Sequence, residues 1–313
     1  MQASSENEPA IRIEGLCKRF GSRTAVANLD LDVAPGELFS LLGPNGAGKT
    51  TTIKMLCCLL RPSAGTASIM GHDIGNDPLA VKRVIGVSPQ ETAVAPNLTA
   101  RENLALIAGL HGLDASRARA RTDELLEVTG LTQRADDKAK KYSGGLQRRL
   151  SVAMALVSDP AVVFLDEPTI GLDPQARRGM WEYIEGLKGE TTIVLTTHYL
   201  EEADALADRV AVVDDGVLVA LGTPAELKAR VLGEPVMIVE AVGVTDDALG
   251  ALLDHYPQAH RVDGGIEIPG EDVSVYEVGD CLRPFDVEIR STSTKHVSLD
   301  DVFLELTGKE LRE

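Results

Sequence analysis

The chain has 313 residues, of which 44% are hydrophobic, and it carries a formal net charge of −17. This length and composition predict a large buried core divided between two domains. No apolar run reaches the roughly eighteen residues of a membrane span, and the N-terminus is polar rather than signal-like. We therefore expect a cytosolic protein whose residues 1–10 are disordered, with any membrane passage supplied by another polypeptide.

The first predicted elements are a β-rich portion over residues 11–33 and a strand over the apolar run at residues 38–42. A glycine-rich loop, GPNGAGKT at residues 43–50, comes next and leads into residues 51–60, which favour a helix. A strand, a loop of the pattern G-x-x-x-x-G-K-[ST] and a helix in this order form a phosphate-binding P-loop. We expect nucleotide binding, the alternative being a glycine-rich turn that merely begins a helix.

The P-loop pattern assigns roles to its residues. The glycines let successive backbone N–H groups and a helix N-terminus face the β-phosphate of a nucleotide. Lys49 would reach the β- and γ-phosphate oxygens, and Thr50 would ligate Mg²⁺. The predicted nucleotide-binding residues of this loop are Gly43, Pro44, Asn45, Gly46, Ala47, Gly48, Lys49, Thr50 and Thr51.

The middle of the chain alternates between strand-like and helical segments. A strand-like run at residues 84–87 precedes Gln90, which alone would indicate only a solvated loop residue, and residues 99–130 favour helices. The stretch YSGG at residues 142–145 then begins another helix, with Ser143 as its N-cap. A second helix N-terminus that can bind an anion suggests that two chains share each ATP. A basic group here indicates a solvated helix face, or else a contact with nucleotide or a partner: Lys138, Lys140, Lys141, Arg148 and Arg149.

Two further apolar runs end in residues with catalytic chemistry. Residues 161–165 predict a buried parallel strand that ends in Asp166 and Glu167. At the carboxyl end of such a strand, where α/β sheets bind ligands, Asp166 would hold Mg²⁺ through water and Glu167 would polarise the attacking water. Acidic residues that merely end a surface strand are the alternative. The strand over residues 191–195 would bring His198 to the same sheet edge.

The C-terminal third predicts a change of fold. Residues 210–221 indicate a hairpin with an Asp-Gly turn, and Thr223 with Pro224 begins a short helix that closes the first domain. Beyond residue 233 the order approximates β-α-β-β-α-β, a ferredoxin-like arrangement. The predicted segments are strands at 236–242, within 261–268 and at 286–291, helices at 246–253 and 272–282, and a last helix at 299–307 capped by Ser298. Residues 225–313 hold 8 basic and 19 acidic side chains, a net −11 that disfavours binding to nucleic acid. This region shows no cluster of catalytic residue types in its sequence, so we expect an interaction or regulatory domain.

Together these motifs resemble those of the ATP-binding subunits of ABC transporters. YSGGLQRRL resembles the LSGGQ signature, VVFLDEP the Walker B strand with its catalytic glutamate, and GLD at residues 171–173 the D-loop. Gln90 matches the Q-loop glutamine and His198 the switch histidine. Phe20 matches the aromatic residue that stacks on adenine in this family. The order and spacing of the motifs fit the family from residue 11 to about residue 231.

The resemblance implies an α/β fold and a set of site residues. The fold is a P-loop NTPase of the ABC ATPase type over residues 11–232, with a β-rich N-terminal portion, a RecA-like core and a helical subdomain near residues 91–158. A small α+β accessory domain would occupy residues 233–313. The implied catalytic residues are Lys49, Gln90, Glu167 and His198, the metal-binding residues Thr50, Gln90 and Asp166, and the further nucleotide-binding residues Phe20, Ser143, Gly144 and Gly145.

The resemblance also implies a reaction and partners. The implied reaction is hydrolysis of ATP with Mg²⁺ in a homodimer or heterodimer that closes head to tail around two ATP molecules. A separate integral membrane permease would contact the helical subdomain, which implies a location at the cytoplasmic face of the cell membrane. The signature has Leu146 where many members have glutamine, and basic residues follow. In this it resembles the signatures of the daunorubicin-resistance group, which implies export of a drug-like or hydrophobic compound. The alternatives are a soluble ABC ATPase that acts on DNA or ribosomes, and a P-loop kinase, which would leave Ser143 and His198 unexplained.

Overall fold

The computed structural model describes residues 8–231, 235–270, 273–295 and 298–308. The described residues form two compact units: one comprises residues up to Leu227 together with residues 306–308, and the other lies between Lys228 and Glu305. The dividing point falls inside helix α8 (Pro224–Arg230), a few residues before the boundary predicted between residues 232 and 233.

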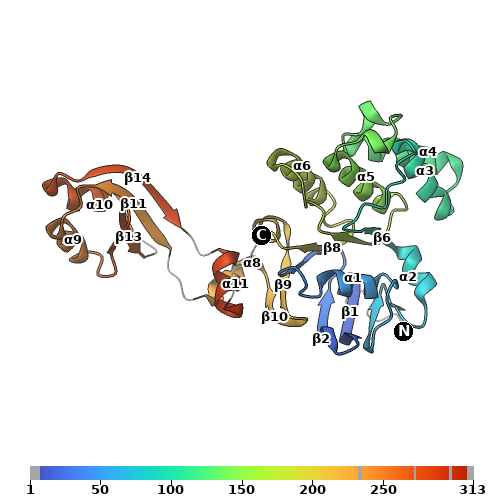
Figure 1. The fold of residues 1–313 in the computed structure, drawn as a ribbon, viewed down its shortest axis with the longest axis horizontal. Coiled ribbons are helices and arrows are strands. Elements are labelled where there is room, and N and C mark those ends of the chain that lie inside the picture. The colour runs from blue at the N-terminus through green and yellow to red at the C-terminus, as the bar shows by residue number, and fades with distance from the viewer. Residues whose placement is uncertain (1–7, 232–234, 271–272, 296–297, 309–313) are drawn as a thin grey trace, which may run out of the picture. The chain divides into compact units, whose positions relative to one another are not determined.

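A six-stranded sheet forms the centre of the first unit (Figure 1). Its strand order is β10 (Val217–Gly222), β9 (Arg209–Asp214), β3 (Leu38–Leu42), β8 (Thr192–Thr197), β7 (Val162–Asp166) and β6 (Ile85–Ser88). All neighbouring strands are parallel except β10, which pairs antiparallel with β9. Every residue of β3, β7 and β8 is buried, because these strands are covered on both faces, and their sequences are accordingly largely apolar rather than alternating.

The register of the parallel strands brings three strand ends together. Leu42 of β3 pairs with Thr197 of β8, and Asp166 of β7 pairs with Thr196 of β8. The residues that follow these strands therefore meet at one edge of the sheet, namely the glycine loop after β3, Glu167 after β7 and His198 after β8. Parallel sheets bind ligands at this carboxyl edge.

The β9–β10 hairpin supports the glycine loop. Its turn contains Asp215 and Gly216 with φ of 46° and 80°, the left-handed pair that an Asp-Gly type I′ turn requires. The N–H of Gly216 donates to the carbonyl oxygen of Ala47 (3.1 Å), and the carbonyl oxygen of Gly216 accepts from the N–H of Ala27 (2.8 Å). The hairpin predicted over residues 210–221 therefore forms, and its turn connects the loop to the β-rich portion.

The β-rich portion is a four-stranded antiparallel sheet that packs on the central core. Its order is β2 (Arg23–Val33), β1 (Ile11–Phe20), β4 (Ala64–Ile69) and β5 (His72–Asp73). Buried side chains of this sheet, such as Leu16 and Ile69, share one apolar cluster with Phe39 and Phe164 of the central sheet. Of the stretch 1–10 predicted to be disordered, residues 1–7 lie outside the described residues, whereas Ala10 is buried.

Helix α1 (Lys49–Leu56) begins at the end of the glycine loop and is shorter than the predicted helix over residues 51–60. It stops because Cys58 adopts a left-handed φ of 55°, and Pro62 follows four residues later in the sequence. The first unit also contains the helices α2 (Pro78–Val84), α6 (Pro174–Glu185) and α7 (Leu200–Leu206).

Three helices form the helical subdomain: α3 (Ala100–Leu110), α4 (Ala115–Val128) and α5 (Gly144–Leu156) (Figure 1). They pack against one another. Each begins at a residue whose side chain caps the first turn, and Thr99 forms a full capping box with Glu102. The helical region predicted over residues 99–130 thus begins at its cap Thr99, and α5 begins at the predicted cap Ser143, whereas the start of α4 after Asp114 was not predicted.

The second unit has the predicted β-α-β-β-α-β order. Its elements are β11 (Val236–Val242), α9 (Asp246–Leu253), β12 (His260–Val262), β13 (Gly265–Pro269), α10 (Val275–Leu282) and β14 (Glu288–Lys295). The sheet is antiparallel with the order β12-β13-β11-β14. The edge strands β12 and β14 thus flank β13 and β11, which is the ferredoxin-like arrangement. Its core includes Val239, Ile266 and Leu282.

The last described helix is α11 (Leu299–Thr307), whose bounds match the prediction. Ser298 caps it, because its Oγ accepts from the N–H of Asp301 (3.3 Å). In the described part of the chain, no helix combines the length and the apolar character that crossing a bilayer requires.

Candidate functional site

A cavity of about 500 Å³ lies at the sheet edge where β3 and β7 end. Its walls come from the glycine loop with α1, from the β1–β2 hairpin, and from residues that follow β6 and β7. The lining residues are Phe20, Arg23, Ala25, Pro44, Asn45, Gly46, Gly48, Lys49, Thr50, Thr51, Gln90 and Glu167. The fold therefore brings together most of the nucleotide-binding residues that the sequence predicts.

The glycine loop takes a conformation that strongly favours glycine at two positions. Gly46 and Gly48 have φ of 89° and 105°, and a Cβ on Gly48 would lie 2.4 Å from the carbonyl oxygen of Ala25. Helix α1 then starts at Lys49 without a side-chain cap, so its first N–H groups receive no side-chain acceptor. Such N–H groups attract phosphate oxygens, which is why the loop fits a nucleotide.

Two residues that were predicted to bind nucleotide, Gly43 and Ala47, do not line the cavity. A Cβ at Gly43 would lie 2.1 Å from the carbonyl oxygen of Val213. Ala47 is buried, and its carbonyl oxygen accepts from the turn residue Gly216. Gly43 and Ala47 therefore shape the loop rather than line the space that it encloses.

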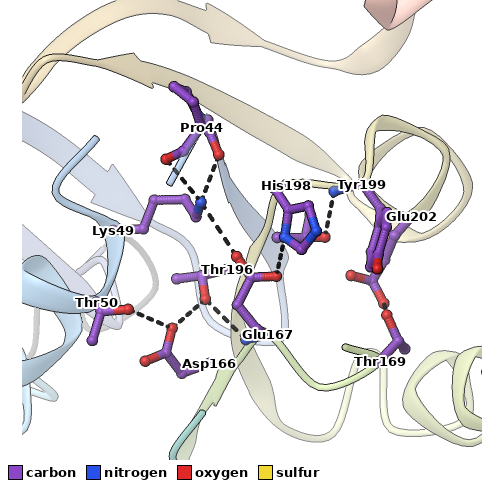
Figure 2. A network of polar contacts seen from close by, with 12 residues as sticks. Pro44, Lys49, Thr50, Asp166, Glu167, Thr169, Thr196, His198, Tyr199 and Glu202 are labelled. Carbon is purple, nitrogen blue, oxygen red and sulfur yellow. Dashed lines mark hydrogen bonds and ion pairs between the residues drawn. The ribbon is translucent and has the colours of Figure 1, made fainter. Parts of the chain in front are cut away.

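Lys49 is buried and folds back over the loop (Figure 2). Its Nζ donates to the carbonyl oxygens of Gly43 (2.5 Å) and Pro44 (3.3 Å), and it lies 3.2 Å from Oε1 of Glu167. Burial lowers the pKa of Lys49, while the carboxylates of Glu167 and Asp166 oppose this shift. The loop carbonyls thus hold a compact positive charge beside the cavity, which suits phosphate oxygens.

A hydroxyl and a carboxylate meet beside the start of α1. Thr50 Oγ1 donates to Oδ1 of Asp166 (3.1 Å), and Thr196 Oγ1 donates to the same atom (2.5 Å). Mg²⁺ prefers oxygen ligands of this kind and completes its shell with water and substrate phosphates. The chemistry of Thr50 and Asp166 therefore fits the predicted metal, and Gln90 lines the adjacent cavity.

Glu167 lies between a cation and an imidazole (Figure 2). Oε1 faces Lys49, and Oε2 lies 2.8 Å from Nδ1 of His198. The backbone of Glu167 has a φ of 53°, and its N–H donates to both Oγ1 (3.0 Å) and the carbonyl oxygen (3.1 Å) of Thr196. A left-handed non-glycine residue is strained and persists only where its surroundings enforce it. Both carboxylate oxygens are thus engaged, and the side chain lines the cavity in a fixed orientation.

The mouth of the cavity carries an aromatic ring and a second cation. Phe20 is 50% exposed, and Nζ of Lys18 lies 5.1 Å from its ring centre. Arg23, which was not predicted as a site residue, lines the same cavity. Phe20 and Arg23 pair across the tight turn of the β1–β2 hairpin. Arg23 could have been predicted as a site residue only from its position three residues after Phe20 in the sequence.

The second predicted anion site lies apart from the cavity within this chain. Ser143 is exposed, and its Oγ accepts from the N–H of Leu146 (3.4 Å), as predicted for an N-cap. Ser143, Gly144 and Gly145 are not among the residues that line the cavity. A nucleotide in this cavity would therefore contact the glycine loop of this chain but not the Ser143 segment of the same chain.

Comparison with known proteins decides the family. The family model described as ABC transporter matches residues 26–170. A daunorubicin resistance ATP-binding protein of Streptomyces coeruleorubidus is 42% identical over 97% of this chain and 98% of the relative. The chain belongs to the ABC transporter ATP-binding subunits. The resemblance to the daunorubicin-resistance group is thereby confirmed.

Other similar proteins agree with this assignment. A Nod factor export ATP-binding protein of Ralstonia nicotianae is 41% identical to this ABC subunit over 97% of the chain and 96% of the relative. A solved dimeric ATP-binding cassette, in a post-hydrolysis state bound to ADP and Pi, superposes with a TM-score of 0.63 at 27% identity, and the match covers 68% of this chain and 98% of that one. The ABC subunit binds ATP and is an ATPase, and its family works as dimers with membrane permeases.

Two buried charges in the ABC subunit were not predicted. The interpretation of the basic group as a solvated helix face is wrong for Arg148, which is only 3% exposed. Glu202 is fully buried, and its Oε1 accepts from Oγ1 of Thr169 (2.8 Å) and Nε1 of Trp181 (3.0 Å). Burial raises the pKa of Glu202. Because neither role follows from the quoted motifs, only the packed structure identifies these two residues.

Substitution of Arg23 tests whether the mouth of the cavity contributes to ATP binding. We expect Arg23→Ala to raise the Kd for ATP about two- to fivefold, because an exposed ion pair contributes up to about 1 kcal/mol. Titration of the full-length chain with a fluorescent ATP analogue measures this change. Arg19→Ala is the matched control, since Arg19 is exposed on the same hairpin but does not line the cavity. Equal effects of the two substitutions would contradict a local contact.

Proposed function

We propose that this ABC subunit hydrolyses Mg·ATP to drive export of a hydrophobic or drug-like compound through a separate membrane permease. The observation that carries the hydrolytic part is the network at the sheet edge, where Glu167 bridges Lys49 and His198. The export part rests on the relatives, whose names record daunorubicin resistance and Nod factor export.

The proposed roles follow from the contacts of each side chain. The N–H groups of the glycine loop and the ammonium of Lys49 bind the β- and γ-phosphates. Thr50, Gln90 and Asp166 hold Mg²⁺, which when bound supplies electrostatic stabilisation of the phosphate oxygens. Phe20 stacks on adenine through its exposed ring.

Glu167 is the proposed base, and His198 orients it. A carboxylate that lines the cavity can accept a proton of the attacking water while the water oxygen bonds to the γ-phosphorus, the bond from that phosphorus to the β–γ bridging oxygen breaks, and ADP leaves. The contact between Nδ1 of His198 and Oε2 of Glu167 fixes the direction of the carboxylate. Because Lys49 also pairs with Glu167, a γ-phosphate would compete for Lys49 and so leave Glu167 free to act on water.

The proposed working unit is a head-to-tail dimer. Ser143, Gly144 and Gly145 of each chain would bind the ATP held by the P-loop of the other chain, since they do not reach the cavity of their own chain. The similar cassette that was solved as a dimer supports this proposal. Closure on ATP and opening after hydrolysis would then drive a membrane permease from the cytoplasmic face of the membrane.

Co-purification and transport test the proposed function together. The tagged full-length chain, extracted in mild detergent from its own host, should bring down an integral membrane protein. Cells that lack the chain should accumulate more daunorubicin, used as a probe compound, than cells that carry it. Cells that carry Glu167→Gln instead should behave like those that lack the chain, because this variant cannot complete hydrolysis.

The outcomes separate the proposed function from its alternative. Recovery of ribosomes or DNA without a membrane protein would favour a soluble ABC ATPase that acts on nucleic acid. Recovery of a membrane protein with unchanged accumulation would support a transporter whose substrate lies outside the chemistry of the probe. The tag alone, expressed in the same host, controls for adventitious capture.

A further inference from the structure

One guanidinium, that of Arg148, joins two loops of the site. Its Nη1 donates to the carbonyl oxygens of Pro89 (2.6 Å) and Gln90 (3.1 Å), the first two residues after β6. Its Nε donates to the carbonyl oxygen of Pro168 (3.0 Å), and its Nη2 donates to that of Asp166. All four acceptors are main-chain oxygens, so the contact depends on the path of the backbone.

The burial of Arg148 indicates that this geometry serves more than packing. Burial lowers the pKa of Arg148 to about 10, although the carboxylates of Asp166, Glu167 and Glu202 oppose the shift, so the group stays charged at neutral pH. No carboxylate in the described part of the chain forms an ion pair with it. Burying a charge destabilises the folded state unless hydrogen bonds compensate it, and an apolar side chain of similar volume avoids that cost.

The acceptors of Arg148 flank residues that act in the cavity. The carbonyl groups of Asp166 and Pro168 bracket Glu167, whose φ of 53° is strained. The carbonyl group of Gln90 belongs to the residue whose side chain lines the cavity. A planar guanidinium with several fixed donors can hold two backbone segments at a set separation, which a flexible ammonium does less well.

We propose that Arg148 is a positioning residue for hydrolysis, which holds Glu167 and Gln90 in their working positions through four main-chain hydrogen bonds. This inference rests on the function proposed above for Glu167 and Gln90. Arg148 does not itself line the cavity, so it acts through these two residues rather than on the nucleotide.

Arg148→Met is the first test, because it keeps an unbranched side chain and removes all donors. We expect kcat for Mg·ATP hydrolysis by the full-length chain to fall roughly 10²-fold, since small misplacements of catalytic groups can cost that much. The Kd for ATP should change little, because the P-loop contacts persist. Arg148→Lys should lose less activity than Arg148→Met, because it keeps the charge and some of the donors.

Arg121→Met is the matched control. Arg121 is also a largely buried arginine of the helical subdomain, and its Nη2 donates to the carbonyl oxygen of Leu156 (3.2 Å), away from the cavity. It should lower the melting temperature without lowering kcat per folded molecule. If Arg148→Met only lowers the melting temperature in the same way, the positioning role is overturned. If Arg148→Met does not fold, Arg148→Lys decides: a lowered kcat with unchanged Kd supports the role, and a native kcat overturns it.

A double-mutant cycle with Glu167→Gln separates this inference from the proposed function. If Arg148 acts mainly by holding Glu167, adding Arg148→Met to Glu167→Gln should reduce single-turnover hydrolysis far less than it does in the native chain. The same fold-loss in both backgrounds would overturn the proposed role of Arg148 and leave that of Glu167 intact. Native turnover by Glu167→Gln alone would instead overturn the proposed base, and with it the role proposed for Arg148.

Discussion

Lys49→Ala should lose ATP binding and ATP hydrolysis together. The ammonium of Lys49 is held by the loop carbonyls of Gly43 and Pro44, beside the N-terminus of α1, where the phosphates are expected. This charge would contact the phosphates both in bound ATP and in the transition state. Removing it should therefore weaken the binding of ATP and the stabilisation of the transition state. We expect kcat/KM to fall roughly 10²-fold or more, as for loss of a preorganised charge-stabilising group. Calorimetric titration with ATP and a phosphate-release assay measure the two effects.

The control for this variant is Lys54→Ala, because Lys54 is an exposed lysine of the same helix. It should leave binding and turnover near native values. Lys49→Ala also leaves the buried carboxylate of Glu167 without its cation, so the melting temperature without nucleotide should be compared for both variants. A folded Lys49→Ala chain that still hydrolyses ATP at a near-native rate would refute the phosphate-binding role.

The elements with strong local signals were predictable from the sequence. The strand Leu38–Leu42, the strand Val236–Val242 and the helix Leu299–Thr307 have the predicted bounds. A mostly apolar run, interrupted once in each strand, or a capping serine defines each of them locally. The ferredoxin-like order was also predictable, since it follows from the succession of short elements. The pairing of β11 between β13 and β14, by contrast, depends on contacts distant in sequence.

Departures from prediction arise where a local signal was ambiguous. The helix expected to extend to residue 60 ends at Leu56, because Cys58 turns left-handed, and no glycine announces that turn. The strand predicted at residues 286–291 is instead β14 (Glu288–Lys295), an edge strand that pairs only with β11 and whose residues are all exposed. In both cases tertiary position overrides the residue pattern.

The residues of the site also include some that the sequence predicted and one that it did not. Lys49, Glu167 and His198 follow strands whose ends the parallel register brings together, so the motif order predicted their proximity. Arg148 was missed because it lies in a basic run, and no periodicity tells a buried arginine from an exposed one. Its acceptors are carbonyl oxygens of loops far away in sequence, which carry no side-chain signal.

Glu167→Gln should separate binding from turnover. Glutamine keeps the shape of the side chain and can retain a contact with His198, but it cannot take a proton from water. We expect ATP to bind while turnover falls roughly 10²-fold or more, because only the transition state loses an interaction. ATP that binds without being hydrolysed should keep two chains together. Light scattering with Mg·ATP, beside a steady-state phosphate assay, measures both consequences.

Glu201→Gln is the control for this variant, because Glu201 is an exposed glutamate at the start of α7. It should hydrolyse ATP at the native rate and accumulate no trapped dimer, because each dimer that closes on ATP reopens after hydrolysis. Because Ser143 lies apart from the cavity of its own chain, a trapped dimer of Glu167→Gln should dissociate when Ser143 is replaced by a bulky residue such as arginine. A Glu167→Gln chain that binds Mg·ATP yet stays monomeric, even with its membrane partner present, would contradict the head-to-tail dimer and leave the role of Ser143 without support.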